Sequence, residues 1–186
     1  MKPKLHPNPL PCWAAAIALV VALDGPAAAE PAPLPTVAAV DLARYAGAWY
    51  EIALLPNRFQ RQCVADTQAR YVLDEGRVRV INRCRTADGT IDTARGRAKT
   101  VEGSGNARLK VSFFWPFYGD YWVLDLDPDY QRVLVGTPSR EYAWVLSRSP
   151  QMDEAQLQQL LDKAARLGFD KSAFRRTPQT QPLAQD

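Results

Sequence analysis

From Trp49 to Arg148, short stretches of mixed apolar and polar residues alternate with clusters of Gly, Pro, Asn and Asp. Within the stretches, apolar residues recur mainly at every second position, which is typical of strands with one buried face. The pattern predicts eight strands, at residues 49–55, 67–73, 77–83, 93–101, 108–114, 121–126, 132–136 and 142–148. Strands this short, joined by short turns, predict an all-β fold, an antiparallel sandwich or barrel.

After the last strand the apolar residues follow the period of a helix, which predicts one amphipathic α-helix. Ser149 and Pro150 are typical of an N-cap and a first helical residue, and Gly168 is typical of a helix end. Because the strands form the core, we expect the helix to pack on the outside of the barrel. Its apolar face consists of Leu157, Leu160, Leu161, Ala164 and Leu167.

The first 29 residues have the features of a secretion signal. Lys2 and Lys4 precede an uncharged apolar run at 13–23, and small residues at 27–29 suit a signal peptidase. The run is too short to span a membrane, which takes about 20 residues. We therefore expect a signal peptide at 1–29, a Pro/Ala-rich flexible arm at 30–40, a folded domain at 41–176 and a loose tail at 177–186.

Removal of the signal peptide limits the chemistry that remains. His6 is the only histidine of the chain and leaves with the signal. The mature chain therefore has no histidine for a nucleophile pair or for a zinc or haem site, and we expect no enzyme activity, metal or cofactor. Cys12 precedes the apolar run, so it cannot be the acylated cysteine of a lipoprotein. We expect a protein that is free in the periplasm.

Two cysteines remain in the mature chain, Cys63 and Cys84. They flank the predicted strand pair that turns at residues 74–76. Antiparallel pairing about this turn brings Cys84 opposite Asp66, so a modest bend would bring the two thiols together. In an oxidising compartment this arrangement predicts a disulfide bond. Two unrelated thiols are the alternative.

Positive charge is concentrated in one part of the sequence. The whole chain has a net charge of +3, while residues 58–110 hold 12 Lys or Arg residues against 6 Asp or Glu residues. This segment could make transient contact with an anionic membrane surface. Alternatively, its arginines occupy outward strand positions in contact with water, which is the interpretation we favour. The basic residues do not cluster on a helix, so nucleic acid is not an expected partner.

Several motifs resemble those of the lipocalin family. Gly47-Ala48-Trp49 resembles its G-x-W motif, residues 119–123 resemble its second conserved region, and Arg148 resembles the arginine of its third. Residues 110–119 are similar to a segment of the bacterial outer-membrane lipocalins, a group related to apolipoprotein D. The resemblance implies an eight-stranded antiparallel up-and-down β-barrel with one α-helix packed outside. It also implies that Arg148 stacks on Trp49 and closes one end of the barrel.

The resemblance further implies a hydrophobic ligand inside the barrel, a fatty acid or a lysophospholipid that is stored or transported in the periplasm. Two alternatives stay open: a filled-barrel interaction protein, which could be a homodimer, and a lipocalin-fold enzyme that modifies a lipid. Seven aromatic residues lie between 113 and 122, more than one core strand needs, so some should face the cavity, its mouth or a partner. Strand alternation gives the candidate ligand contacts Tyr71, Val80, Asn82, Leu109, Val111, Phe113, Tyr121, Trp122 and Trp144.

Overall fold

The structure is a computed structural model that describes residues 33–74 and 77–184, and the predicted signal peptide at 1–29 lies outside them. The barrel strands are β1 (Gly47–Leu54), β2 (Cys63–Asp74), β3 (Arg77–Thr86), β4 (Ile91–Thr100), β5 (Arg108–Phe114), β6 (Phe117–Leu126), β7 (Arg132–Gly136) and β8 (Ala143–Ser147). The other elements are α1 (Leu42–Tyr45), η1 (Arg58–Gln60), α2 (Glu154–Arg166), η2 (Lys171–Ala173) and β9 (Arg175–Arg176).

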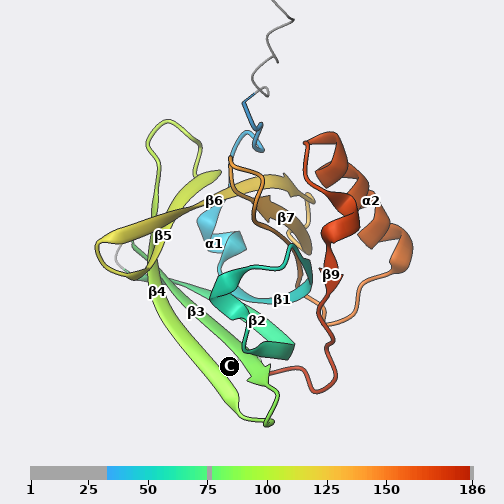
Figure 1. Cartoon of the computed structure of the whole chain (residues 1–186). Helices are drawn as coiled ribbons and strands as arrows, with labels where there is room; N and C mark the ends of the chain where they lie inside the picture. The colour runs from blue at the N-terminus through green and yellow to red at the C-terminus, as the bar shows by residue number, and fades with distance from the viewer. Residues whose placement is uncertain (1–32, 75–76, 185–186) are drawn as a thin grey trace, which may run out of the picture. The chain divides into compact units, whose positions relative to one another are not determined.

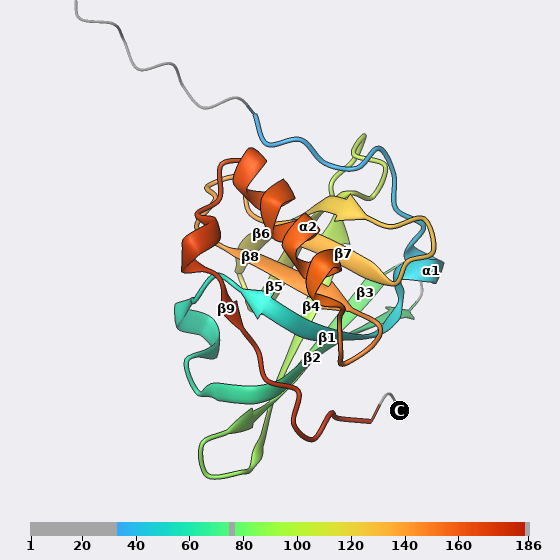
Figure 2. The same cartoon turned by 90° about the vertical axis from the view of Figure 1, so that its right-hand side faces the viewer.

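The strands form a closed antiparallel barrel, which confirms the predicted fold. From β2 to β8, strands that follow one another in the sequence pair with each other, and β1 pairs with both β8 and β2, so the sheet closes on itself. Figure 1 looks along the barrel, and Figure 2 shows α1 at one end and the loop with η1 at the other. We call these the closed end and the mouth. The turns 86–90 and 114–117 lie at the mouth because β3 and β5 run toward it.

Alternation along the strands separates two hydrophobic clusters. On β7, Val133 and Val135 belong to the cluster inside the barrel, whereas Leu134 belongs to the cluster beneath α2. The helix buries Leu157 and Leu161 in this outer cluster. The prediction of one helix packed outside the barrel is therefore confirmed, and Figure 2 shows α2 lying across the wall.

The predicted start of the helix is wrong by a few residues. The N-cap is Asp153, whose carboxylate accepts hydrogen bonds from the backbone N–H groups of Ala155 and Gln156. The Ser149 hydroxyl instead accepts a bond from the N–H of Gln151, which makes a local turn before the helix. Ser and Asp can both cap a helix, and here the carboxylate, which also suits the positive end of the helix dipole, holds the position.

The described part of the arm before the barrel, residues 33–40, is bound to the barrel. Leu34 and Val40 are almost fully buried. The backbone N–H of Val37 donates to the carbonyl of Val123 at 3.0 Å, and the N–H of Val40 donates to the carbonyl of Gly105 at 2.8 Å. Leu34 packs in the cluster beneath α2 and Val40 in the cluster inside the barrel, so apolar side chains hold the segment against the barrel.

The described part of the tail, residues 177–184, is also bound to the barrel. β1 pairs with β2 only from Gly47 to Tyr50, and the chain after β9 lies against the rest of that edge. The Gln179 amide donates to the carbonyls of Glu51 and Thr67, at 2.9 and 3.0 Å. Polar composition suggested a solvated tail, but the unpaired strand edge supplies backbone partners for these polar groups.

Asp66 fixes the tail more firmly. It is fully buried, and its carboxylate accepts hydrogen bonds from the backbone N–H groups of Thr180 and Gln181 at 2.7 and 2.9 Å. Arg85 donates to the same carboxylate at 2.6 Å. Burial opposes ionisation of Asp66, but these hydrogen bonds outweigh it and hold its pKa below the ordinary value.

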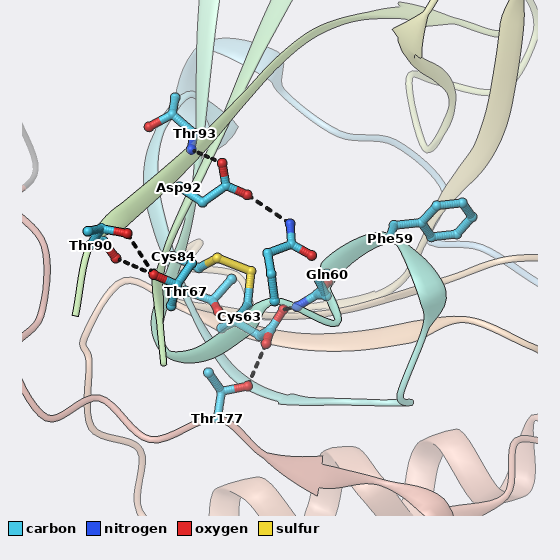
Figure 3. The surroundings of a disulfide bond; sticks show 12 residues. Phe59, Gln60, Cys63, Thr67, Cys84, Thr90, Asp92, Thr93 and Thr177 are labelled. Carbon is cyan, nitrogen blue, oxygen red and sulfur yellow. Dashed lines mark hydrogen bonds between the residues drawn. A yellow bond between two sulfur atoms is a disulfide. The ribbon is translucent and has the colours of Figure 1, made fainter. Parts of the chain in front are cut away.

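The predicted disulfide is confirmed. Cys63 and Cys84 are bonded, with their Cα atoms 5.4 Å apart, at the end of the β2–β3 pair that lies near the mouth (Figure 3). The bend that the pairing required is present as register shifts between Cys63 and Gln68. Asp66, inside this irregular stretch, has a φ of 54°.

Candidate ligand-binding site

Arg148 and Trp49 close one end of the barrel interior. The guanidinium carbon of Arg148 lies 4.0 Å from the centre of the Trp49 ring, and the Trp49 indole donates to the carbonyl of Tyr45 at 2.8 Å. Arg148 also donates to the carbonyls of Ala46 and Ala48, each at 2.8 Å. Gly47 has a φ of 96°, and a Cβ there would lie 3.2 Å from Arg148 Nη1. These residues hold α1 against the barrel and form its floor.

Above the floor lies a narrow, almost entirely apolar cavity of about 20 Å³. Its lining comes from the inward faces of β2 to β6 and from the segment around α1, and consists of Val40, Leu42, Tyr45, Ala46, Tyr71, Leu73, Val78, Ala98, Leu109, Val111, Tyr121 and Val123. By this measure one water molecule needs about 10–15 Å³. This cavity has room for little more than one water molecule, so a long ligand that occupies it requires some of the lining side chains to move.

Three tyrosine hydroxyls meet in this cavity. The hydroxyl oxygens of Tyr45 and Tyr121 are 2.7 Å apart, and the Tyr71 hydroxyl donates to Tyr121 at 2.9 Å. Burial raises the pKa of Tyr71 to about 12 and the pKa values of Tyr45 and Tyr121 well above 10, so all three are neutral donors at physiological pH. Two hydrogen bonds use two of the three hydroxyl hydrogens. The third hydrogen is available to an oxygen acceptor in an otherwise apolar site.

The structure brings most of the sequence-predicted contacts together. Tyr71, Val80 and Leu109 are buried in the inner cluster, and Val111, Tyr121 and Trp144 pack against it. Asn82 lies two residues along β3 from Val80, and its buried Oδ1 has no hydrogen-bond partner among the described residues. Phe113 lies nearer the mouth: a Cβ on Gly96 would be 2.8 Å from its ring, so the ring packs on that glycine.

Trp122 is the exception, because it lies on the other face of β6 from the remaining predicted contacts. Its neighbour Tyr121 faces inward, so alternation turns Trp122 outward, where it packs against the cluster beneath α2. The guanidinium of Arg108 lies 4.3 Å from the centre of its ring. Conversely, strand alternation missed Tyr45, because this residue reaches the cavity from the short helix before the barrel.

The loop from Leu55 to Gln62 reaches the mouth. The Gln60 amide donates to the Glu51 carboxylate at 2.8 Å, and its oxygen accepts a bond from the Trp144 indole at 3.2 Å. The Thr177 hydroxyl donates to the other carboxylate oxygen of Glu51. Figure 3 shows Gln60 and Thr177 near the disulfide, with Phe59 directed away from it. Glu51 therefore links the mouth loop to the tail. A more open hollow of about 300 Å³ lies beside this link.

Burial raises the pKa of Glu51, although the bonds from Thr177 and Gln60 oppose the shift. A raised pKa means that the folded protein holds the Glu51 proton more tightly than the unfolded chain does. The stability that this proton adds to the fold is complete in acid and is lost as pH rises through the pKa of the folded state. We expect Glu51→Gln to become more stable, relative to the parent chain, as pH rises from about 5 to about 8. Urea unfolding at each pH measures this. Titration of Asp66 does not affect this comparison, because its lowered pKa means that the carboxylate is protonated only in stronger acid. Parallel stability curves for the two proteins would contradict the expectation.

The comparisons with known proteins agree with this geometry. The sequence model of the lipocalin-like domain matches residues 40–179. The chain belongs to the lipocalin family. Its members bind small hydrophobic ligands and are generally binding or transport proteins rather than enzymes. Here the two cysteine thiols are joined, so neither is a free nucleophile. Among the described residues, no group of three His, Cys, Asp or Glu side chains could hold a metal ion.

This lipocalin is similar to proteins from plants and bacteria. It is 42% identical to temperature-induced lipocalin-1 of Arabidopsis thaliana, over 81% of this chain and 86% of the relative. It is 41% identical to outer membrane lipoprotein Blc of Escherichia coli (strain K12), over 89% of this chain and 93% of the relative. In its described part, the lipocalin has no helix with the length and hydropathy of a membrane span.

Solved structures show the same fold at lower identity. Insecticyanin of the tobacco hornworm Manduca sexta superposes with a TM-score of 0.64 at 23% identity, covering 82% of this chain and 89% of that one. Apocrustacyanin C2 superposes with a TM-score of 0.63 at 17% identity, covering 76% and 81%. At these identities the likeness concerns the fold alone.

Proposed function

We propose that this lipocalin binds a fatty acid or lysophospholipid inside its barrel and stores or transports it in the periplasm. The observation that supports this most directly is the apolar cavity that contains one available hydroxyl hydrogen among Tyr45, Tyr71 and Tyr121. Burying about fifteen CH₂ groups gains about 12 kcal/mol, which leaves micromolar affinity after an association cost of about 4 kcal/mol. The relative named outer membrane lipoprotein Blc supports a site of action outside the cytoplasm.

Phe113 is the side chain that would make room for an acyl chain. Its ring packs on Gly96, beside the inward positions Ala94 and Ala98 of β4, where small side chains leave space once the ring moves. Phe113 is 36% exposed at the mouth, so it can rotate toward water without losing a hydrogen bond. An acyl chain would then take the place of the ring.

The first test blocks the cavity from one position on β5. Val111 lines the cavity, whereas its neighbour Lys110 points outward to Asp120, 2.7 Å away. We expect Val111→Trp to lower the affinity for a fluorescent fatty acid at least tenfold, and Lys110→Trp to leave it nearly unchanged. Titration by fluorescence measures both, with thermal unfolding to confirm that each variant folds. Equal affinities for the two variants would contradict the proposal that the ligand binds in this cavity.

The tyrosines predict how different lipids lie in the barrel. A carboxyl group fits the small space at the floor, but the headgroup of a lysophospholipid is too large for about 20 Å³ and would stay at the mouth. We expect Tyr45→Phe/Tyr71→Phe/Tyr121→Phe, which removes all three hydroxyls, to weaken fatty-acid binding about tenfold, which corresponds to one lost hydrogen bond. Lysophospholipid binding should change little. Trp122→Phe, on the outward face of β6, is the matched control. An unchanged fatty-acid affinity in the triple variant would contradict the floor-bound carboxyl.

The small cavity also favours a second candidate, a filled-barrel interaction protein. Native mass spectrometry of chain purified without detergent, followed by lipid extraction, separates the two. A lipid bound at near-unit stoichiometry supports the carrier. A protein that yields no lipid and takes up no added acyl chain supports the filled barrel.

A further inference from the structure

The turn between β5 and β6 carries an unusual number of exposed aromatic side chains. Phe114, Trp115 and Phe117 are 81%, 73% and 77% exposed. Side chains of this size normally bury most of their surface, and a contiguous exposed group usually marks a contact with a partner or a lipid. We call these three residues the aromatic tip.

The aromatic tip lies at the mouth of the barrel. β5 ends and β6 begins there, and Figure 1 shows this hairpin projecting from the left side of the barrel. Three further exposed apolar residues lie at the same end, because the antiparallel order places the starts of β2 and β4 at the mouth with η1. They are Phe59, Val64 and Ile91. The apolar surface therefore lies around the opening through which a ligand would pass.

Positive charge lies directly beside the tip. Arg95, Arg97 and Lys99 are exposed on β4, at alternate positions on one face. In the sheet register Arg97 is opposite Ser112 of β5, and the Lys99 ammonium lies 4.6 Å from the centre of the Tyr118 ring on β6. Within the part of the chain that the structure describes, none of the three has a carboxylate within 4.0 Å, the limit for an ion pair.

We propose that the aromatic tip and the three cationic side chains of β4 dock the mouth of the barrel on an anionic lipid bilayer. Aromatic side chains suit the interface between headgroups and acyl chains, and neighbouring Lys and Arg side chains suit anionic headgroups. The proposal rests on the proposed carrier function, because it gives a lipid a path between bilayer and barrel that avoids water.

A second copy of this chain is the other partner that an apolar surface could suit. Two copies meeting through the same patch would bring two sets of three uncompensated positive charges together. Like charges at a contact oppose association. The charge beside the tip therefore favours an anionic bilayer, and a dimer becomes an outcome that the experiment must be able to detect.

The experiment measures how the purified chain partitions onto sucrose-loaded vesicles that sediment. One set is phosphatidylcholine alone, and in the other about a third of the lipid is phosphatidylglycerol. We expect preferential binding to the second set, with a blue shift of tryptophan emission. The variant Arg95→Ser/Arg97→Ser/Lys99→Ser should partition about 100-fold more weakly, since each charge contributes roughly fivefold. Phe114→Ser/Trp115→Ser/Phe117→Ser should also lose binding and most of the blue shift.

Matched controls come from the opposite end and from the helix. Val101 is an exposed apolar residue away from the mouth, and Arg166 is an exposed cation on α2. Val101→Ser and Arg166→Ser should partition like the parent chain. Thermal unfolding of every variant checks that the fold is kept, which the exposure of the substituted side chains leads us to expect.

Three results would overturn the proposal. The first is equal partitioning onto both vesicle types, and the second is a tip variant that partitions like the parent chain. The third is a dimer in sedimentation equilibrium that dissociates when the tip is changed, which would assign the surface to a second copy. Fatty-acid titration without vesicles tests the carrier function separately from docking on a bilayer. Docking without fatty-acid binding contradicts the carrier alone, and fatty-acid binding without docking contradicts the docking surface alone.

Discussion

Arg148→Ala should lower the free energy of unfolding by about 3 kcal/mol. The guanidinium donates to the carbonyls of Arg44, Tyr45, Ala46 and Ala48, and also covers the Trp49 ring. Its removal leaves several partly buried acceptors unsatisfied and uncovers the largest fully buried side chain of the core. Urea unfolding followed by tryptophan fluorescence measures the loss.

Two variants identify the origin of this effect. Arg166→Ala removes an exposed guanidinium from α2 and should change stability by less than about 0.5 kcal/mol. Arg148→Lys keeps the charge but loses the planar fork that reaches several carbonyls, so it should recover only a minor part of the loss. If Arg148→Lys were as stable as the parent chain, the charge above Trp49 would matter and the hydrogen bonds would not.

The double variant Cys63→Ala/Cys84→Ala should lose about 3 kcal/mol of stability. The bond joins residues separated by 21 positions, and closing a loop of this length restricts the unfolded chain by about that amount. Cys84 is also buried, so alanine there adds a small packing cost. Thermal and urea unfolding of the oxidised parent and the variant measure the difference.

The parent chain treated with a thiol reductant is the natural control, since it loses the bond but keeps the side chains. It should approach the stability of the double variant. A loss below about 1 kcal/mol in both would mean that the unfolded chain already keeps the β2–β3 hairpin, so that the bond restricts it little. Fatty-acid affinity should persist, because neither cysteine lines the apolar cavity.

The strands could be predicted because their alternation is a local property of the sequence. β5 and β7 have the predicted bounds, and β1 to β4, β6 and β8 differ from the prediction only at their ends. The disulfide followed from the same pattern, because pairing about one turn brings the two cysteines close. The alternation does not predict irregular stretches of a strand. The register shifts between Cys63 and Gln68, with the positive φ of Asp66 inside them, could not be read from it.

The candidate site was only partly predictable for a related reason. Alternation separates the two faces of a strand, but a shift of one residue in register exchanges the inner face for the outer one. Tyr121 and Trp122 are adjacent and both aromatic, so composition alone cannot separate the cavity residue from the helix contact. Tyr45 and the residues that hold the tail act across long sequence distances. Their roles depend on tertiary contacts that no short window of sequence contains.

The tail takes part in closing the wall of this barrel. Between β1 and β2 the wall is joined by strand pairing only near the closed end, up to Tyr50. Further along, the tail bridges the two strands: the Gln179 amide donates to a carbonyl of each, and the backbone N–H of Asp66 donates to the carbonyl of Pro178. The wall between β1 and β2 is thus completed by tail residues that hydrogen-bond to both strands. A chain cut after Arg176 would lose part of its side wall as well as its end.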